Sequence, residues 1–373
     1  MSSLRIVALP GDGIGPEVTA AALRVLEVVA ADAGIGLDIA IRPIGGAQID
    51  IDGRALAPET LAACRAADAV LLGAVGGPRW EQPARGCERP EQGLLALRAG
   101  LGVYCNLRPA RLWPALADRS PLRPEFRSGG IDLVICRELT GGIYFGESGT
   151  REVTGPAGPE LESYDVEAYR EHEIRRILER AVEIARGRRG RLCLVDKANV
   201  LESSRLWRRL MRDVARQNPD LEVEYLYVDN AAMQLIRRPG SFDVIVTSNI
   251  FGDILSDESA EIIGSIGLMP SAALGAAGSA GLYEPIHGSA PDLAGRDLAN
   301  PLAAILSAAL LLRYAGANEA AAVRIERAVE AVLDAGWRTA DLAMPDTEAK
   351  RILGCGAMTR AVLEELAGAR CSD

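Results

Sequence analysis

Histidine and lysine are nearly absent from this chain of 373 residues. The two histidines are His172 and His287, and so few exclude a zinc site with three or more histidine ligands. The two lysines, Lys197 and Lys350, stand beside 39 arginines. Either the two lysines remain by chance in a composition that favours arginine, or they are retained for their chemistry. Lysine, unlike arginine, releases its proton where burial or a nearby cation lowers its pKa.

Other absences exclude whole classes of partner. Aromatic residues make up only 4% of the chain, and a net charge of −10 with a pI near 5.0 disfavours nucleic acid. The longest uncharged apolar run, 302–312, is too short to span a bilayer, and the first residues contain no secretion-type segment. The seven cysteines are odd in number and include no Cys-x-x-Cys, which favours the reducing cytoplasm.

What is present is an alternation of short apolar runs and longer helical patterns. The length predicts two domains or one large interleaved domain. The alternation predicts an α/β fold with a largely parallel sheet. Predicted strands are 4–9, 68–72, 132–137, 191–195, 223–228 and 242–247, and predicted helices are 17–31, 57–67, 91–99, 167–186, 199–216, 250–265, 300–314 and 319–334. Residues 140–159 form either a floppy loop or a β-arm that a partner buries.

Glycine-rich residues follow the first predicted strand. The order Gly-Asp-Gly-Ile-Gly at 11–15 invites comparison with the dinucleotide fingerprint Gly-x-Gly-x-x-Gly. The third glycine comes one residue too early for that fingerprint. By itself the segment therefore predicts a tight turn between strand and helix.

Two carboxylates lie one helical turn apart in the segment 248–257. Asp253 and Asp257 share one face of the predicted helix, and oxygen ligands of this kind suit Mg²⁺ or Mn²⁺. Asp229 follows the predicted strand 223–228, at the edge where functional groups of α/β proteins emerge. The alternative is a solvated acidic helix start that the helix dipole favours.

Several polar side chains end apolar stretches. Arg98, Arg108 and Arg137 are suited to bidentate binding of a carboxylate, although any of them could instead form a surface salt bridge. Lys197 ends another predicted strand, where a lysine beside a divalent ion can act as a base. The Gly/Pro-punctuated loop 284–292 contains His287 and is either a binding loop or a structural turn. His172 lies in a charged helical stretch and is expected to be solvated.

Together these segments resemble the β-decarboxylating dehydrogenases, the family of the isocitrate and isopropylmalate dehydrogenases. The resemblance covers nearly the whole chain, from residue 9 to residue 359. It rests on Gly-Ala-Val-Gly-Gly-Pro at 73–78, Glu-Leu-Thr-Gly-Gly-Ile-Tyr-Phe-Gly at 138–146, Asp-Lys-Ala-Asn-Val at 196–200, Asp-Asn-Ala-Ala-Met-Gln at 229–234, and the 249–257 and 284–292 segments. The probability that all of these motifs agree by chance is negligible.

The resemblance implies an isopropylmalate dehydrogenase-like α/β fold of two domains, with a mixed, largely parallel sheet and a protruding dimer arm. The cofactor-side domain would comprise 1–103 and 264–373. The substrate and dimerisation domain would comprise 104–263, with the arm at about 138–165. The family also implies a homodimer, in which the partner subunit completes each cleft.

The resemblance also implies a role for each site residue. The substrate would be bound by Arg98, Arg108, Arg137, Asp229, Glu91, Leu94 and Leu95. The metal ligands would be Asp253 and Asp257, with Asp229 from the partner. Lys197, also from the partner, would be the base and Tyr144 the acid. The cofactor NAD would contact Ile14, Glu284, His287, Gly288, Ser289, Ala290, Pro291, Asp292 and Asn300.

The implied reaction is the NAD-dependent, divalent-metal-dependent oxidative decarboxylation of (2R,3S)-3-isopropylmalate to 4-methyl-2-oxopentanoate and CO₂, in leucine biosynthesis. Lys197 would take the C2 hydroxyl proton as hydride leaves for the nicotinamide. The ion would polarise the new ketone while CO₂ departs, and Tyr144 would protonate the enolate carbon.

Local residues decide between related substrates and cofactors. Leu94 and Leu95 suit an isopropyl group, whereas isocitrate would bring a third carboxylate against leucine. Asp292 suits the ribose of NAD, since a carboxylate accepts a hydrogen bond from a 2′-hydroxyl and repels a 2′-phosphate. The alternatives are a related enzyme acting on D-malate, tartrate or homoisocitrate, and a non-catalytic regulatory subunit.

Overall fold

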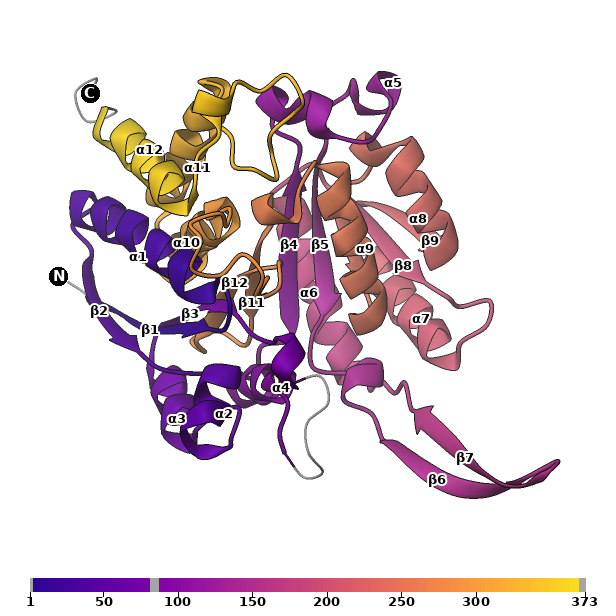
Figure 1. The fold of residues 1–373 in the computed structure, drawn as a ribbon. Helices are drawn as coiled ribbons and strands as arrows, with labels where there is room; N and C mark the ends of the chain where they lie inside the picture. The colour runs from indigo at the N-terminus through magenta and orange to yellow at the C-terminus, as the bar shows by residue number, and fades with distance from the viewer. Residues whose placement is uncertain (1–2, 81–86, 369–373) are drawn as a thin grey trace.

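The computed structural model describes residues 3–80 and 87–368. Its centre is a ten-stranded sheet in the order β2-β1-β3-β12-β11-β4-β5-β10-β8-β9 (Figure 1). The strands are β1 Ser3–Gly11, β2 Gly36–Ile41, β3 Ala69–Ala74, β4 Cys105–Arg111, β5 Asp132–Glu138, β8 Arg191–Asp196, β9 Glu222–Tyr227, β10 Val244–Thr247, β11 Pro270–Leu274 and β12 Gly281–Pro285.

Helices cover both faces of this sheet (Figure 1). They are α1 Gly15–Asp32, α2 Gly46–Asp52, α3 Pro58–Ala66, α4 Pro90–Leu101, α5 Pro124–Arg127, α6 Glu171–Arg186, α7 Glu202–Gln217, α8 Val228–Arg237, α9 Asn249–Ile262, α10 Leu302–Tyr314, α11 Glu319–Asp334 and α12 Cys355–Gly368. Short 3-10 turns include η2 Pro114–Arg119, η3 Gly142–Tyr144 and η6 Ala349–Arg351. The predicted α/β fold with a mixed, largely parallel sheet is confirmed.

The sheet consists of two parallel blocks joined by antiparallel pairs. Within one block, β2, β1, β3 and β12 are parallel to one another, and within the other block β5, β10, β8 and β9 are parallel to one another. Between the blocks, β11 pairs antiparallel with β12 and β4, and β4 pairs antiparallel with β5. The predicted domain boundary falls between β11 and β4, where Ala272 lies opposite Leu107. The division into two domains stays a prediction.

The longest apolar run of the sequence forms an interior helix. Every residue of α10 from Leu302 to Leu312 is buried, as expected of a helix that is apolar on all sides. α10 packs against α1 and α11 and against β12. Among the described residues, no helix combines the length and the apolar character that a membrane crossing requires.

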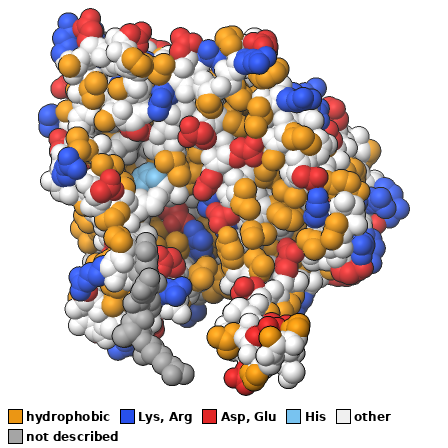
Figure 2. All heavy atoms as spheres, turned by 45° about the vertical axis from the view of Figure 1, so that its right-hand side comes forward, with side chains coloured by type: hydrophobic (Ala, Val, Ile, Leu, Met, Phe, Trp, Pro, Cys, Tyr) orange, Lys and Arg blue, Asp and Glu red, His pale blue; other side chains and the backbone are white. Residues whose placement is uncertain are grey.

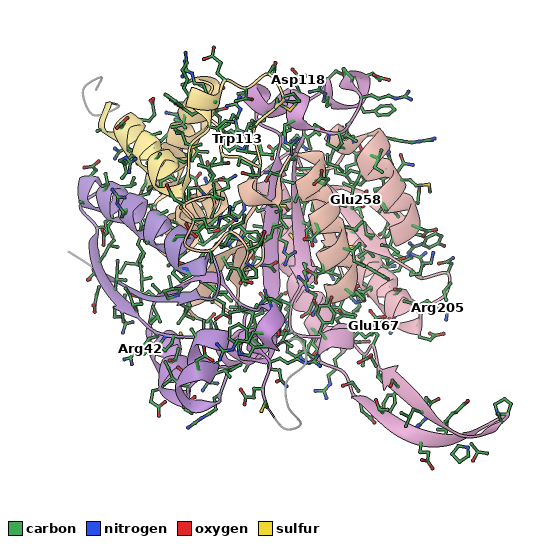
Figure 3. All side chains as sticks on the ribbon, in the orientation of Figure 1. Arg42, Trp113, Asp118, Glu167, Arg205 and Glu258 are labelled. Atoms are coloured by element: carbon green, nitrogen blue, oxygen red, sulfur yellow. The ribbon has the colours of Figure 1, made fainter. Side chains whose placement is uncertain are left out.

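A hairpin of β6 Ser148–Gly155 and β7 Gly158–Asp165 projects from the body of the molecule (Figures 1 and 3). Of the two alternatives for residues 140–159, the structure contains the β-arm. Its side chains point into solvent, and Leu161 is 77% exposed. On the same side of the molecule, the surface is hollowed between the two blocks, and acidic and basic side chains gather in the hollow (Figure 2).

The sequence patterns missed several elements and misplaced one site residue. Strands β2, β4, β11 and β12 and helices α2, α5, α8 and α12 were not predicted. Asp229 does not end a strand, because β9 stops at Tyr227 and Asp229 lies in the first turn of α8. Arg98 lies in the last turn of α4, within the helix predicted at 91–99. The cysteines within the described residues are all free.

Candidate active site

Arg108 and Arg137 face the same side of the sheet because of the register of β4 and β5. In this antiparallel pair Asn106 lies opposite Arg137, so their side chains share a face, and Arg108, two residues along β4, points there too. Arg108 Nε donates to Asn106 Oδ1 at 2.7 Å. Both arginines are buried, with exposures of 6% and 2%.

The start of α9 covers these arginines. β10 places Thr247 beside Arg137, and the chain then enters α9. Asp253 accepts hydrogen bonds through one oxygen from Arg137 Nη1 and from Arg108 Nη1, the latter at 3.2 Å. Tyr144 Oη donates to the other oxygen at 3.0 Å. A single carboxylate therefore contacts three of the predicted site residues.

The charges in this cluster shift one another's pKa values. Burial raises the pKa of Asp253, but Arg137 and Arg108 outweigh that effect, so its pKa lies below the usual value. Asp257, one turn along α9 and 3.6 Å from Arg108, has a pKa raised by burial. Burial, together with the charge of Arg108, lowers the pKa of Arg137 to about 9. An anion bound beside this cluster would stabilise the charged form of the arginines, and a bound cation would stabilise the ionised form of Asp257.

A cavity of about 180 Å³ adjoins this cluster where the two blocks meet. It brings together predicted substrate and cofactor residues, among them Glu91, Leu94, Arg98, Arg108, Glu284 and His287. Arg98 Nη2 donates to Glu284 Oε1 at 2.7 Å, and both side chains are buried. Leu95, the other predicted apolar contact, does not line this cavity.

The glycine turn 11–15 packs against the loop 284–292. Ile14 N donates to Ser289 O at 2.8 Å. Gly13 has a φ of +57°, and a Cβ there would lie 2.0 Å from the same carbonyl oxygen, so only glycine fits. Asp12 accepts backbone hydrogen bonds from Gly46, Ala47 and Gly76. The turn is thus a packed structural element beside the predicted cofactor loop.

The predicted cofactor residues differ in what they already contact. His287 Nδ1 lies 2.9 Å from Gly288 O, while its Nε2 is buried with no hydrogen-bond partner among the described residues. Burial lowers the pKa of His287, so the ring is neutral at pH 7. Asn300 donates to Asp341 at 3.0 Å and accepts from Leu302 N at the start of α10. Pro291 and Asp292 are exposed, and Ala290 has a positive φ of 36°.

Lys197 and Asp229 form a second group. Lys197 Nζ lies 2.8 Å from Asp229 Oδ1, and this hydrogen bond lowers the pKa of Asp229. No hydrogen bond or ion pair among the described residues joins this pair to Asp253 in the same chain. Within one chain, the structure therefore brings together the arginines, Tyr144 and the α9 carboxylates, but not the predicted base.

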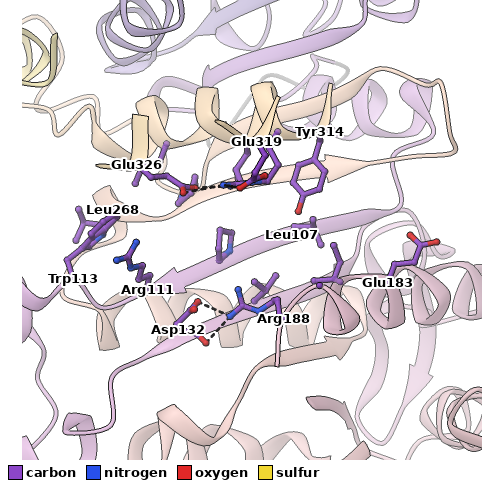
Figure 4. Close-up of a pocket in the computed structure, with 18 residues that line it drawn as sticks. Leu107, Arg111, Trp113, Asp132, Glu183, Arg188, Leu268, Tyr314, Glu319 and Glu326 are labelled. Atoms are coloured by element: carbon purple, nitrogen blue, oxygen red, sulfur yellow. Dashed lines mark hydrogen bonds and ion pairs between the residues drawn. The ribbon is translucent and has the colours of Figure 1, made fainter. Parts of the chain in front are cut away.

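A larger cavity of about 500 Å³ lies on the opposite face of the sheet (Figure 4). Leu107 and Pro109 line it, whereas Arg108 between them faces the site, because side chains alternate along β4. Several of its charged groups are paired with each other: Arg313 binds Glu319 and Glu326, and Arg188 binds Asp132. None of the predicted site residues lines this cavity.

Sequence reasoning missed residues that hold the site together. Asn106 and Ser256 both bind Arg108, Asn249 binds Arg137, and Asp341 binds Asn300. For Asn249 a signal existed, since it is the second residue after the predicted strand 242–247, at the edge where functional groups emerge. No comparable pattern marks Asp341, which lies in a loop far along the chain from Asn300.

The fold places arginines and paired carboxylates beside a cavity and a loop whose His287 Nε2 has no partner among the described residues, an arrangement that suits an acidic substrate. Residues 5–362 match the family described as isocitrate/isopropylmalate dehydrogenase, and the chain belongs to that family. The resemblance and the enzyme class predicted from the sequence are confirmed.

Individual relatives cover almost the whole chain. It is 54% identical over 355 residues to the 3-isopropylmalate dehydrogenase of Anaeromyxobacter dehalogenans, covering 93% of this chain and 99% of the relative. It is 56% identical over 341 residues to the enzyme of the same name from Pseudomonas fluorescens, covering 91% and 93%. The crystal structure of isocitrate dehydrogenase from Methylococcus capsulatus has a TM-score of 0.83 at 34% identity, covering 97% and 99%.

Proposed function

We propose that the protein is a cytoplasmic, NAD-dependent 3-isopropylmalate dehydrogenase of leucine biosynthesis, which oxidises (2R,3S)-3-isopropylmalate to 4-methyl-2-oxopentanoate and CO₂. The observation that carries the proposal is one cavity lined by both Leu94 and two buried arginines, Arg98 and Arg108. Relatives named for this reaction are more than half identical to the chain. A dicarboxylate with one apolar branch fits this lining.

The arginines bind the two carboxylates of the substrate. Two buried donors support this role, since Arg98 Nε and Asn106 Nδ2 have no hydrogen-bond partner among the described residues. A buried unpaired donor is costly, and a carboxylate oxygen would satisfy it. Leu94 packs against the isopropyl group, whereas the third carboxylate of isocitrate would lose its water against leucine.

The carboxylates at the start of α9 suit a divalent ion. Asp253 and Asp257, with Asp229 of the partner subunit, offer only oxygen ligands, which Mg²⁺ or Mn²⁺ prefers. The raised pKa of Asp257 supports this assignment, because a bound cation would offset the cost of ionising it. When bound, the ion supplies Lewis-acid stabilisation of the oxygen at C2.

Lys197 of the partner subunit acts as the base and Tyr144 as the acid. Lysine accepts the proton of the C2 hydroxyl as hydride leaves C2. Burial raises the pKa of Tyr144, and the charge of Asp253 raises it further, so the phenol keeps its proton and can donate it to the carbon that loses CO₂. The 42% exposure of Tyr144 leaves its ring open to the cleft.

The cofactor is NAD, bound by the loop 284–292 together with Ile14 and Asn300. The unpaired His287 Nε2 is a buried polar atom that a ligand can satisfy. Asp292 is exposed and accepts from the ribose 2′-hydroxyl. When bound, NAD would supply the acceptor for the hydride, and the loop residues would hold its nicotinamide towards the cavity.

The active form is a homodimer in which each subunit completes the other's site. Apolar side chains are exposed on the two helices beside the site: Met233 and Ile236 on α8 are 55% and 47% exposed, and Ile254 on α9 is 59% exposed. A two-fold interface through α8 and α9 would bury them. It would also bring Lys197 and Asp229 of one subunit towards Asp253 of the other.

Reduction of NAD measured by absorbance tests the function. The full-length protein with 3-isopropylmalate and Mn²⁺ should form NADH, and chelator should abolish the signal. Isocitrate and D-malate should show lower kcat/KM. A preference for D-malate would contradict the substrate assignment, and a purified dimer inactive with all three acids would support a regulatory subunit instead.

A further inference from the structure

Asn249 lies between two parts of the site that the proposed function uses separately. It is the first residue of α9 and is 1% exposed. On one side lies Arg137, which binds a substrate carboxylate, and on the other lies the turn that leads to Tyr144. The hydrogen bonds of this one side chain reach both.

On the arginine side, Asn249 fixes the plane of the guanidinium group. Arg137 Nε and Nη2 donate to Asn249 Oδ1 at 3.0 and 2.8 Å, and Nε also donates to its backbone oxygen at 2.9 Å. Gly252 leaves the necessary space, because a Cβ there would lie 2.6 Å from Arg137 Cγ. Only Nη1 remains directed at Asp253.

On the tyrosine side, Asn249 holds the turn that carries the phenol. Its Nδ2 donates to Gly141 O at 3.0 Å, and Gly142 and Tyr144 bound the following 3-10 turn η3. Tyr169 packs behind this turn: a Cβ on Gly142 would lie 2.2 Å from Tyr169 Oη. The same hydroxyl accepts from Asn249 N at 2.9 Å. Every polar group of Asn249 on this side is therefore engaged.

We propose that Asn249 is a positioning residue that couples substrate binding by Arg137 to the placement of Tyr144. Its carbonyl oxygen orients the arginine and its amide group orients the tyrosine turn, so the two move together. The guanidinium carbon of Arg137 also lies 5.7 Å from the centre of the Tyr144 ring, which keeps the two groups in register. This inference rests on the proposed function of these two residues.

Two substitutions separate the two sides of Asn249. Asn249→Asp keeps an oxygen for Arg137 but loses the donor to Gly141, so we expect KM for 3-isopropylmalate within about twofold of wild type and kcat reduced about tenfold. Asn249→Ala loses both contacts, so KM should rise and kcat should fall, each by about tenfold. KM for NAD should change in neither variant.

Asn318→Ala is the matched control. Asn318 stands directly before the first residue of α11, and its side chain accepts from Ala321 N at 2.9 Å. This variant should lose stability without any change in the ratio of kcat to KM. If the Asp and Ala variants instead shared one kinetic pattern, or Asn249→Ala kept wild-type kcat and KM, the coupling would be refuted.

Crystal structures of the variants give a readout that does not depend on activity. In Asn249→Asp, Arg137 should stay in place while residues 141–144 shift, and in Asn249→Ala both should shift. Unmoved Arg137 and Tyr144 in Asn249→Ala would overturn the inference. A wild-type protein inactive with 3-isopropylmalate would refute the proposed function alone, and the structures would still decide the role of Asn249.

Discussion

Lys197 and Lys350, the two lysines, occupy different surroundings although both form an ion pair. Lys197 Nζ lies 2.8 Å from Asp229 Oδ1, and the Lys197 side chain is 27% exposed. Lys350 pairs with Glu348 at the surface, and its side chain is 76% exposed. The lower exposure of Lys197 favours the functional alternative for this lysine, and its role stays a prediction. Lys350 fits the alternative of chance survival.

Lys197→Arg keeps the charge and the partner Asp229 but removes a group that can release its proton. We expect kcat to fall about 10²- to 10⁴-fold, the usual contribution of a general base, with little change in melting temperature. NADH formation under saturating substrate measures it. Lys350→Arg is the control and should keep wild-type turnover; turnover near normal in Lys197→Arg would exclude it as the base.

Asp292→Lys tests the cofactor assignment. A positive charge at this exposed position would attract the 2′-phosphate of NADP, so the ratio of kcat/KM for NADP over NAD should rise at least about tenfold. Asp346→Lys changes another exposed aspartate by the same charge and should leave the ratio unchanged. Equal discrimination in the two variants would mean that Asp292 does not face the ribose.

Single residues also mark the limit of what the sequence predicts about the site. Positions after apolar runs indicated Arg108 and Arg137, helical spacing indicated Asp253 and Asp257, and the structure brings these four together. The pairing of Arg98 with Glu284 could not be predicted, because it joins segments 186 residues apart that meet only through the fold.

At the scale of elements, hydrophobic patterning predicted those strands and helices whose apolar residues recur at a regular spacing. The helix predicted at 250–265 is α9, with Asp253 and Asp257 one turn apart as expected. β4 was missed because Asn106, Arg108 and Pro109 interrupt its apolar residues; they face a site and a cavity that the pattern does not reveal. α8 was missed because the strand predicted at 223–228 extends to Val228, the first residue of this helix.

The segment between the arm and α6 provides a pH test of stability. Glu167 lies there and accepts from Ser203 of α7 at 3.2 Å, and burial raises its pKa above the usual value (Figure 3). A raised folded-state pKa means that the folded protein binds the proton more tightly, so this group's stabilisation is complete below the unfolded-state pKa and is lost as pH rises through the folded-state pKa.

Glu167→Gln should therefore unfold at a higher denaturant concentration than wild type at pH 8, and at a similar one at pH 4. Glutamine still accepts from Ser203 but carries no charge to bury. Denaturant titrations at the two pH values measure this difference. Glu179→Gln, on the exposed face of α6, should give no such pH-dependent gain; a gain equal to that of Glu167→Gln would argue against burial as the cause.

At the scale of the whole molecule, the predicted site residues form two separate groups within one chain. The arginines, Tyr144 and the α9 carboxylates lie together, while Lys197 and Asp229 pair separately next to exposed apolar side chains of α8. The sequence motifs predicted every member of this set, but only the fold shows which members lie together in one chain and which stay apart.

Mixing inactive subunits tests that arrangement. Lys197→Arg and Asp253→Asn should each be nearly inactive, but a hybrid dimer would contain one site with both lesions and one intact site. Random exchange should restore about a quarter of wild-type activity. Asp253→Asn mixed with Asp257→Asn is the control, because both lesions then lie in the half contributed by one subunit. Restoration in the control, or none in the first mixture, would contradict sites shared across the dimer.

The crowded glycine turn after β1 has a consequence for reading genomes. Motif searches assign nucleotide binding from glycine spacing behind a first strand, on the assumption that the missing side chains make room for a phosphate. Here the room at Gly11, Gly13 and Gly15 is already filled by the backbone oxygens of Ala74, Ser289 and Pro10. A scan that relaxed its spacing to accept this chain would mistake tight chain packing for a ligand pocket.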